Sequence, residues 1–358
     1  MAMRISDILQ AHGYGGGGFK VGSDIPFGTY KMVDVKKDVW KKATTYGTNN
    51  VISIRYRKSA NELYCLTRSD RKVHVIDLWT GTIKRTLQLP ANGDTAFGIN
   101  TLYDLLISEG GRLYIFGRDP SGYYNIVTEV NATTGAPIKK FQGTNSTSSI
   151  EPYHIQLIDD SEIYMCMWTG YIDVITLDLT LIKSLAITNS VGNRVYGVDI
   201  DKARDRVVYP QTSNNATTIK SLSDAGASLS KGITTNGSSW SCCFTKSYIA
   251  VCGPSTVVVV DPIAGTEIKR ITGSWGYVST PVHLGNDVIC VMCPFANPEK
   301  LVVVDLVAGT IEFESSWTRP NTNTDYLCRG VAIDDAHVAT PFAAEYGLYK
   351  LVQQIQKR

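Results

Sequence analysis

An internal repeat constrains the fold of this chain more than any other feature. In each copy, an apolar strand-like run ends at Asp or Asn, Gly follows four residues later, and an Ile-Lys segment comes next. The clearest copies span residues 73–85, 131–140, 257–270 and 301–311, and weaker ones span 172–183 and 219–226. An Asp or Asn side chain can hydrogen-bond the backbone just beyond it, and Gly supplies positive φ. The pattern therefore predicts a tight turn between two strands.

Two further apolar segments precede each turn, so each repeat predicts four short strands. Segments such as 62–66, 112–116, 162–166 and 288–291 are expected to form second strands. The copies recur at intervals of about 45 residues, which is typical of the blades of a β-propeller. Inner strands are expected near residues 51, 98, 154, 197, 242, 280 and 330. The sequence therefore predicts an all-β fold, a seven-bladed β-propeller of four-stranded blades.

The two ends of the chain are expected to meet in the last blade. That blade lacks an outer strand, whereas residues 29–35 form a strand-like segment with no local partner. We expect this N-terminal strand to close the ring, because closure removes a sheet edge that would otherwise pair with other chains. The chain is therefore expected to contain two units. Residues 1–26 are a short N-terminal arm with a Gly-rich joint, and residues 27–358 are the propeller.

The net charge of +2 conceals an uneven distribution. Residues 1–90 hold 15 Lys or Arg against 7 Asp or Glu, whereas residues 91–358 hold 20 against 26. A basic surface can meet an acidic partner or nucleic acid. The charges are dispersed and form no nucleic-acid motif, so protein partners are expected, through residues 1–26 and the basic first blade. No apolar run is long enough for a membrane helix or a signal peptide, which predicts a chain that is neither inserted nor secreted.

Cysteines and glycines supply two motifs that resemble functional sites. Cys290 and Cys293 form a CxxC, but no second pair completes a zinc site. Most of the eight cysteines lie in apolar runs, which is typical of buried free thiols. Free thiols in turn indicate a reducing compartment. Gly13, Gly15 and Gly18 match a dinucleotide fingerprint, but without the required preceding strand and following helix. Core thiols and a linker are the preferred interpretations.

Acidic and histidine side chains were the other candidates for chemistry. Asp199, Asp201 and Asp205 are spaced as in a calcium loop, but the Gly and bidentate Glu are missing, so a hairpin turn is expected. His154 and His283 lie near predicted inner strands, and Glu151 lies close to the first of them. A propeller can gather such residues on its axis, yet the sequence shows no base and orienting partner. The sequence therefore assigns no catalytic, cofactor-binding or metal residue.

The Val-Ile-Asp-Leu-x-Thr-Gly-x-Ile-Lys phrase at 75–84 resembles the repeats of YVTN-type and quinoprotein-like β-propellers. Quinoprotein dehydrogenase repeats place Trp eight residues after the Asp, where this chain has Arg85, Lys269 and Phe313. That departure argues against cofactor-dependent dehydrogenase activity. Low charge, abundant Gly, Ser, Thr, Asn and Tyr, and the segment 21–30 also resemble bacteriophage virion proteins. Short-tailed phages build a tail nozzle from propeller subunits.

These features are compatible with three functions. The first is a non-catalytic structural propeller that docks in a larger assembly, a bacteriophage tail or virion, with no cofactor. The second is a lactonase-like propeller enzyme or small-ligand binder with an axial site. The third is a cytoplasmic scaffold that binds other proteins. The expected location is the virion, with the cytoplasm as the alternative.

Overall fold

The structure is a computed structural model, and it describes residues 31–36 and 51–354 with internal gaps. The gaps fall at 79, 145–151, 168–170, 187–196, 212–215, 225–227, 236–240, 277, 279–280, 294–298, 318–330, 335–336 and 343–344. The predicted arm at 1–26 lies outside the described residues. Among the described residues, no helix has the length and apolar character needed to cross a membrane.

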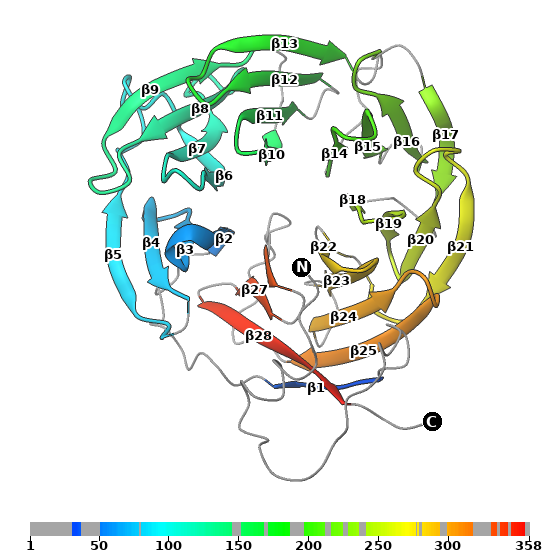
Figure 1. The fold of residues 1–358 in the computed structure, drawn as a ribbon. Coiled ribbons are helices and arrows are strands. Elements are labelled where there is room, and N and C mark those ends of the chain that lie inside the picture. The colour runs from blue at the N-terminus through cyan, green and yellow to red at the C-terminus, as the bar shows by residue number, and fades with distance from the viewer. Residues whose placement is uncertain are drawn as a thin grey trace.

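The chain forms an all-β propeller of four-stranded antiparallel blades arranged around a central axis (Figure 1). Blade 1 contains β2 (Val51–Arg57), β3 (Glu62–Thr67), β4 (Lys72–Asp77) and β5 (Ile83–Gln88), with a short 3-10 helix, η1 (Lys58–Ala60), after β2. Blade 2 contains β6 (Thr101–Ile107), β7 (Leu113–Arg118), β8 (Asn125–Val130) and β9 (Pro137–Gln142). Blade 3 contains β10 (Pro152–Ile158), β11 (Glu162–Met167), β12 (Tyr171–Thr176) and β13 (Leu181–Ala186).

The next three blades repeat this order. Blade 4 contains β14 (Asp199–Asp201), β15 (Arg206–Gln211), β16 (Ala216–Ser221) and β17 (Ser228–Thr234). Blade 5 contains β18 (Ser241–Phe244), β19 (Ile249–Gly253), β20 (Thr256–Val260) and β21 (Glu267–Thr272). Blade 6 contains β22 (Val282–Gly285), β23 (Val288–Cys293), β24 (Glu299–Asp305) and β25 (Thr310–Trp317). In each blade the first strand lies at the axis and the fourth at the rim (Figure 1).

One further four-stranded sheet joins the two ends of the chain. It has the order β1-β28-β27-β26, from β1 (Lys31–Lys36), β26 (Val331–Asp334), β27 (His337–Phe342) and β28 (Glu345–Gln354). The predicted pairing of the N-terminal strand is confirmed, since β1 runs antiparallel to β28. The predicted count of seven blades is corrected, since the structure shows six blades of four consecutive strands. The sheet β1-β28-β27-β26 differs from these six because its strands are not consecutive in the sequence.

The repeated turn forms as the sequence predicts. The Oδ1 atom of Asp77 accepts a hydrogen bond from the Thr80 amide at 2.9 Å, and Gly81 donates to the Asp77 carbonyl with φ of 69°. The same backbone bond closes the turns that begin at Asn131, Asp261 and Asp305. These turns connect the third and fourth strands of four blades.

The basic residue of the Ile-Lys segment links neighbouring blades. It reaches a backbone carbonyl in or beside the third-to-fourth turn of the next blade. These bonds run from Arg85 Nε to Ala132 O at 3.2 Å, from Lys139 Nζ to Asp178 O at 2.6 Å, from Lys183 Nζ to Leu222 O at 3.3 Å and from Lys269 Nζ to Val307 O at 2.5 Å. Part of the repeat therefore encodes contacts between blades.

The hydrophobic core is divided into layers between adjacent blades. Because side chains alternate along a strand, each blade presents one apolar face to each neighbour. Cys242 packs in the layer between blades 4 and 5, whereas the next residue, Cys243, packs between blades 5 and 6. Blade 1 also packs against Val331 of the closing sheet. The layers thus continue past the six consecutive blades into that sheet.

Candidate binding site

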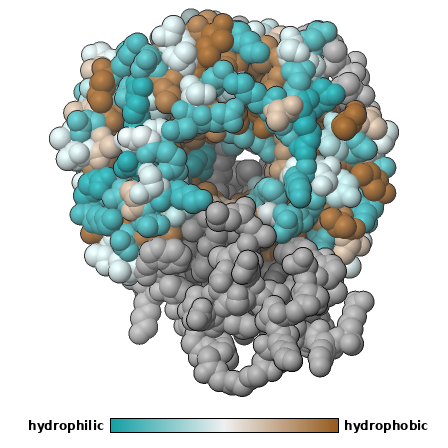
Figure 2. Space-filling model, viewed as in Figure 1, coloured by the Kyte–Doolittle hydropathy of each residue, from teal (hydrophilic) through white to brown (hydrophobic). Residues whose placement is uncertain are grey.

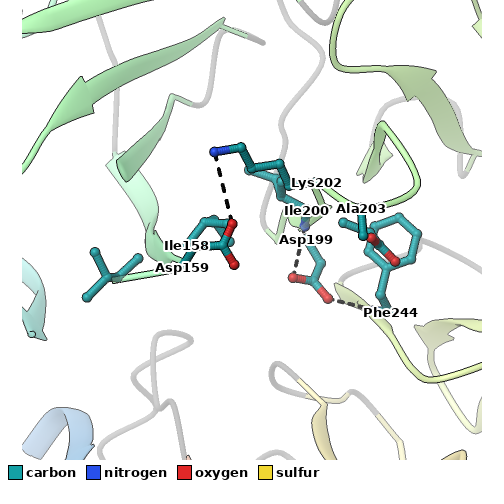
Figure 3. Close-up of a pocket in the computed structure, with 9 residues that line it drawn as sticks. Ile158, Asp159, Asp199, Ile200, Lys202, Ala203 and Phe244 are labelled. Atoms are coloured by element: carbon teal, nitrogen blue, oxygen red, sulfur yellow. Dashed lines mark hydrogen bonds and ion pairs between the residues drawn. The ribbon is translucent and has the colours of Figure 1, made fainter. Parts of the chain in front are cut away.

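An open cavity of about 520 Å³ lies where the first-to-second turns of blades 3 and 4 meet blade 5 (Figure 3). One part of its lining is apolar and the other part is charged. The lining residues are Leu157, Ile158, Asp159, Asp199, Ile200, Asp201, Lys202, Ala203 and Phe244. They come from the end of β10, from β14 and its turn, and from the end of β18.

Asp199 connects three blades at the cavity. Its Oδ1 accepts hydrogen bonds from Gln156 Nε2 of blade 3 at 2.7 Å and from the Ile200 amide at 2.9 Å. Its Oδ2 accepts from the Phe244 amide of blade 5 at 2.6 Å. Burial raises the pKa of the Asp199 carboxyl to about 6, although these hydrogen bonds act in the opposite direction. A partly buried carboxylate therefore stands at the junction of the three blades.

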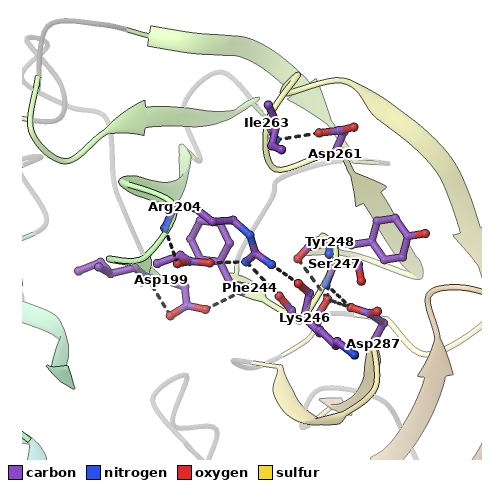
Figure 4. A network of polar contacts seen from close by, with 12 residues as sticks. Asp199, Arg204, Phe244, Lys246, Ser247, Tyr248, Asp261, Ile263 and Asp287 are labelled. Carbon is purple, nitrogen blue, oxygen red and sulfur yellow. Dashed lines mark hydrogen bonds and ion pairs between the residues drawn. The ribbon is translucent and has the colours of Figure 1, made fainter. Parts of the chain in front are cut away.

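The other charged residues of the cavity differ in how they are paired. Asp201 receives hydrogen bonds from Arg204, whose guanidinium also reaches the carbonyls of Thr245 and Lys246 in blade 5 (Figure 4). Lys202 Nζ lies 3.0 Å from Glu162 and 4.0 Å from Asp159. The side chain of Asp159 is 68% exposed. Asp159 is therefore the carboxylate most open to a ligand.

Other first-to-second turns are also joined across blade boundaries. Glu109 of blade 2 accepts from the amides of Lys58 and Ser59 in blade 1, at 3.1 and 2.8 Å. Asp287 of blade 6 accepts from Thr245 Oγ1 and the Ser247 amide of blade 5, both at 2.6 Å (Figure 4). These contacts join the first-to-second turns of neighbouring blades, and the cavity lies among such turns.

The chemistry of the cavity favours a cation with an aliphatic stem. Carboxylates attract a positive charge, and an apolar wall accepts methylene groups, the combination found in Lys and Arg side chains. Within the described residues, no group of three or more His, Cys, Asp or Glu side chains could hold a metal ion. The cavity is therefore suited to an organic cation.

The histidine candidates are not among the cavity residues. His154 lies on β10 and is 9% exposed, with an Nδ1 atom that has no hydrogen-bond partner. His283 lies on β22 in blade 6. Glu151 falls outside the described residues, as do Gly13, Gly15 and Gly18. The sequence did not single out Phe244 or Lys202, because their role arises only when separate blades meet.

The spaced aspartates form the predicted hairpin, and the cysteines behave as predicted core residues. Residues 202–205 connect β14 to β15, as expected for a turn rather than a calcium loop. Seven cysteines are buried free thiols, including Cys290 and Cys293, while Cys328 falls outside the described residues. Burial raises the pKa of the Cys290 thiol far above its usual range. Such thiols are poor nucleophiles and poor metal ligands at neutral pH.

Two arginines of the first blade form hydrogen bonds to other groups of the same chain. Arg71 donates to the carbonyls of Pro90, Ile99 and Asn100 at 2.5, 2.9 and 2.8 Å, on the path from blade 1 to blade 2. Arg55 Nη2 lies 2.9 and 2.8 Å from the two carboxylate oxygens of Asp104 in blade 2. Part of the positive charge of the first blade is therefore used to join blades 1 and 2.

Comparison with known proteins leaves the chain without an assigned family. No protein-family model matches the sequence, and no curated protein matches it significantly. The propeller arrangement itself is established by the sheet topology.

Proposed function

We propose that this chain is a non-catalytic structural propeller that docks in a larger assembly, a bacteriophage tail or virion. The proposal rests on the polar side chains near the axis, which bind partners on neighbouring blades. Arg55 and Asp104 bind each other across one blade boundary, and Gln156 and Asp199 across another. Groups that an axial active site would direct at a substrate are thus directed at neighbouring blades, which favours a rigid ring over a reaction centre.

In this proposal the ring is seven-bladed and of the YVTN-type or quinoprotein-like kind. The closing sheet acts as the seventh blade, because β26 contacts β2 on one side and β22 on the other. Residues 1–26 serve as a tether to a neighbouring protein. Basic residues of the first blade that remain exposed, such as Lys58, add to that contact.

Mass spectrometry of purified native particles tests this function. The protein should be present in these particles in stoichiometric amount. The native mass of the isolated protein, measured alongside, shows whether it is a free monomer outside them. Recovery of the protein only as a free soluble monomer, with none in particles, would overturn the proposal.

A small-ligand binder is the second candidate, and the cavity beside Asp199 is the observation that favours it. Isothermal titration of the isolated protein with agmatine, a guanidinium with an aliphatic stem, tests this role. Saturable binding that is lost in Asp159→Asn would support a ligand site, since Asp159 is the exposed carboxylate of the cavity. Absence of saturable binding to the wild-type protein would reject this class of ligand.

A further inference from the structure

Exposed apolar side chains are concentrated on one face of the propeller. In each blade the first-to-second and third-to-fourth turns lie at the same end, because the first and third strands run in the same direction. We call this end the cavity face, since the cavity beside Asp199 opens among its first-to-second turns. The second-to-third turns lie at the opposite face.

Six of the seven large apolar side chains that are exposed among the described residues belong to the cavity face. They lie in third-to-fourth turns or in the first two positions of outer strands: Ile138, Leu181, Ile182, Ile263, Ile268 and Val307. Ile263 is 74% exposed. The seventh, Tyr123, lies between β7 and β8 at the opposite face. Scattered exposed apolar residues need no explanation, but this one-sided distribution does.

The cavity face also has an ordered polarity. Its aliphatic residues belong to the third-to-fourth turns and outer strands, whereas carboxylates line the cavity near the axis. Figure 2 shows one face of the ring, on which brown and teal surface alternate around a central hollow. An apolar periphery around a polar centre differs from the usual interface, in which an apolar core has a polar rim. A partner that covers the cavity face must therefore have a polar group at the centre of its own surface and apolar residues around that group.

We propose that the cavity face is the docking surface, and that its partner is a protein that places a Lys or Arg side chain in the cavity and apolar residues around it. This inference rests on the proposed function and names the face and the partner chemistry. Asp159 is largely exposed, and among the described residues that line the cavity Lys202 is the one cation, already held by Glu162. Added positive charge is therefore complementary to the site.

The molecule already shows such a contact in its own structure. Arg204 leaves the turn of blade 4, binds Asp201 and reaches the carbonyls of Thr245 and Lys246 in blade 5. An incoming Lys or Arg would meet the same kinds of group, namely a carboxylate and turn carbonyls. A second copy of this chain docked face to face would instead oppose two sets of carboxylates. That like-charge contact disfavours self-association through this face.

Hydroxyl-radical footprinting identifies the face that docks. The protein is oxidised once as the isolated chain and once within purified particles, and each side chain is read by mass spectrometry. Oxidation of Ile263, Ile268 and Val307 should fall by about threefold or more in particles, because the core of an interface excludes water. Tyr123 should be unchanged. Protection of Tyr123 with no protection of the three aliphatic residues would overturn the inference and leave the proposed function standing.

Charge reversal tests the partner chemistry. Tagged Asp159→Lys and wild-type chains are produced together, and their ratio in particles is measured. The variant should be depleted by about tenfold or more, since like charges across an interface cost at least 1.4 kcal/mol. Ser121→Lys is the control, because Ser121 is exposed beside Tyr123 in the turn between β7 and β8, at the opposite face. Equal incorporation of the Asp159 variant would reject a basic partner group, whereas absence of wild-type chain from particles would reject the proposed function.

Discussion

The ion pair between Arg55 and Asp104 gives the sharpest test of how the ring is held together. Asp104 is fully buried, and its carboxylate also accepts from Ser53 Oγ at 2.5 Å and from the Leu105 amide at 2.8 Å. Asp104→Ala would leave the Arg55 guanidinium, whose side chain is 16% exposed, without its carboxylate. Removing one partner of a buried pair costs about 3–5 kcal/mol. Partial access to water at Arg55 places the expected loss at about 3 kcal/mol.

Urea unfolding, followed by tryptophan fluorescence and far-UV circular dichroism, measures this loss. Asp178→Ala is the matched control, since Asp178 forms a pair with Arg112 at 2.8 Å but is 79% exposed. Its loss should be about 1 kcal/mol or less. A cycle of Arg55→Met and Asp104→Leu should give a coupling of about 2 kcal/mol, because the double variant leaves no unpaired buried charge. A loss from Asp104→Ala no larger than that of the control would refute the structural role of the pair.

Four further outcomes are expected. Gly135→Ala should lower the free energy of unfolding by more than about 1 kcal/mol, because φ is 79° and a Cβ would lie 2.6 Å from Gln88 O. Gly232→Ala is the control and should cost less in the same urea assay, because Gly232 has positive φ but open space around it. Because the pKa of Asp199 is raised to about 6 in the folded protein, its contribution to stability is fully present below pH 4 and is lost as pH rises through 6. Between those pH values, the free energy of unfolding of wild type should fall by up to about 2 kcal/mol relative to that of Asp199→Asn. A thiol reagent should modify no more than one of eight cysteines before unfolding, since seven are buried; rapid modification of several would contradict this packing. Deletion of 1–36 should lower the melting temperature, and adding residues 31–36 after 358 should restore it, because Lys31 pairs with Gln354 and a hairpin can join them.

The repeat made the blades predictable because its signals are local. An Asp-x-x-x-Gly turn such as Asp77 to Gly81 needs only its own backbone, and alternating apolar residues define strands without knowledge of neighbours. The pairing of the N-terminal strand was also predictable, since one blade lacked a strand and one strand lacked a blade. These inferences depend on a few adjacent residues or on simple counting.

The cavity could not be predicted in the same way. Leu157, Asp199 and Phe244 lie about one repeat apart in the sequence and meet because three blades converge near the axis. The sequence predicts only inner strands near residues 154, 197 and 242, and a hairpin turn at Asp199, Asp201 and Asp205. The importance of a residue there depends on the blade beside it. A repeat signal describes one blade and says little about such a junction.

The Ile-Lys segment gives the recurrence of the repeat a structural reason. Its turn presents backbone carbonyls, and its basic residue reaches a carbonyl in the following blade, as Lys269 does at Val307. Such bonds join blades 1 to 2, 2 to 3, 3 to 4 and 5 to 6, so blades 2 and 3 both donate to the next blade and accept from the previous one. Such links favour stability through contacts between nearest neighbours, as in other repeat proteins. The repeat residues therefore account for hydrogen bonds between blades, whereas the exposed apolar side chains of the cavity face take no part in those bonds.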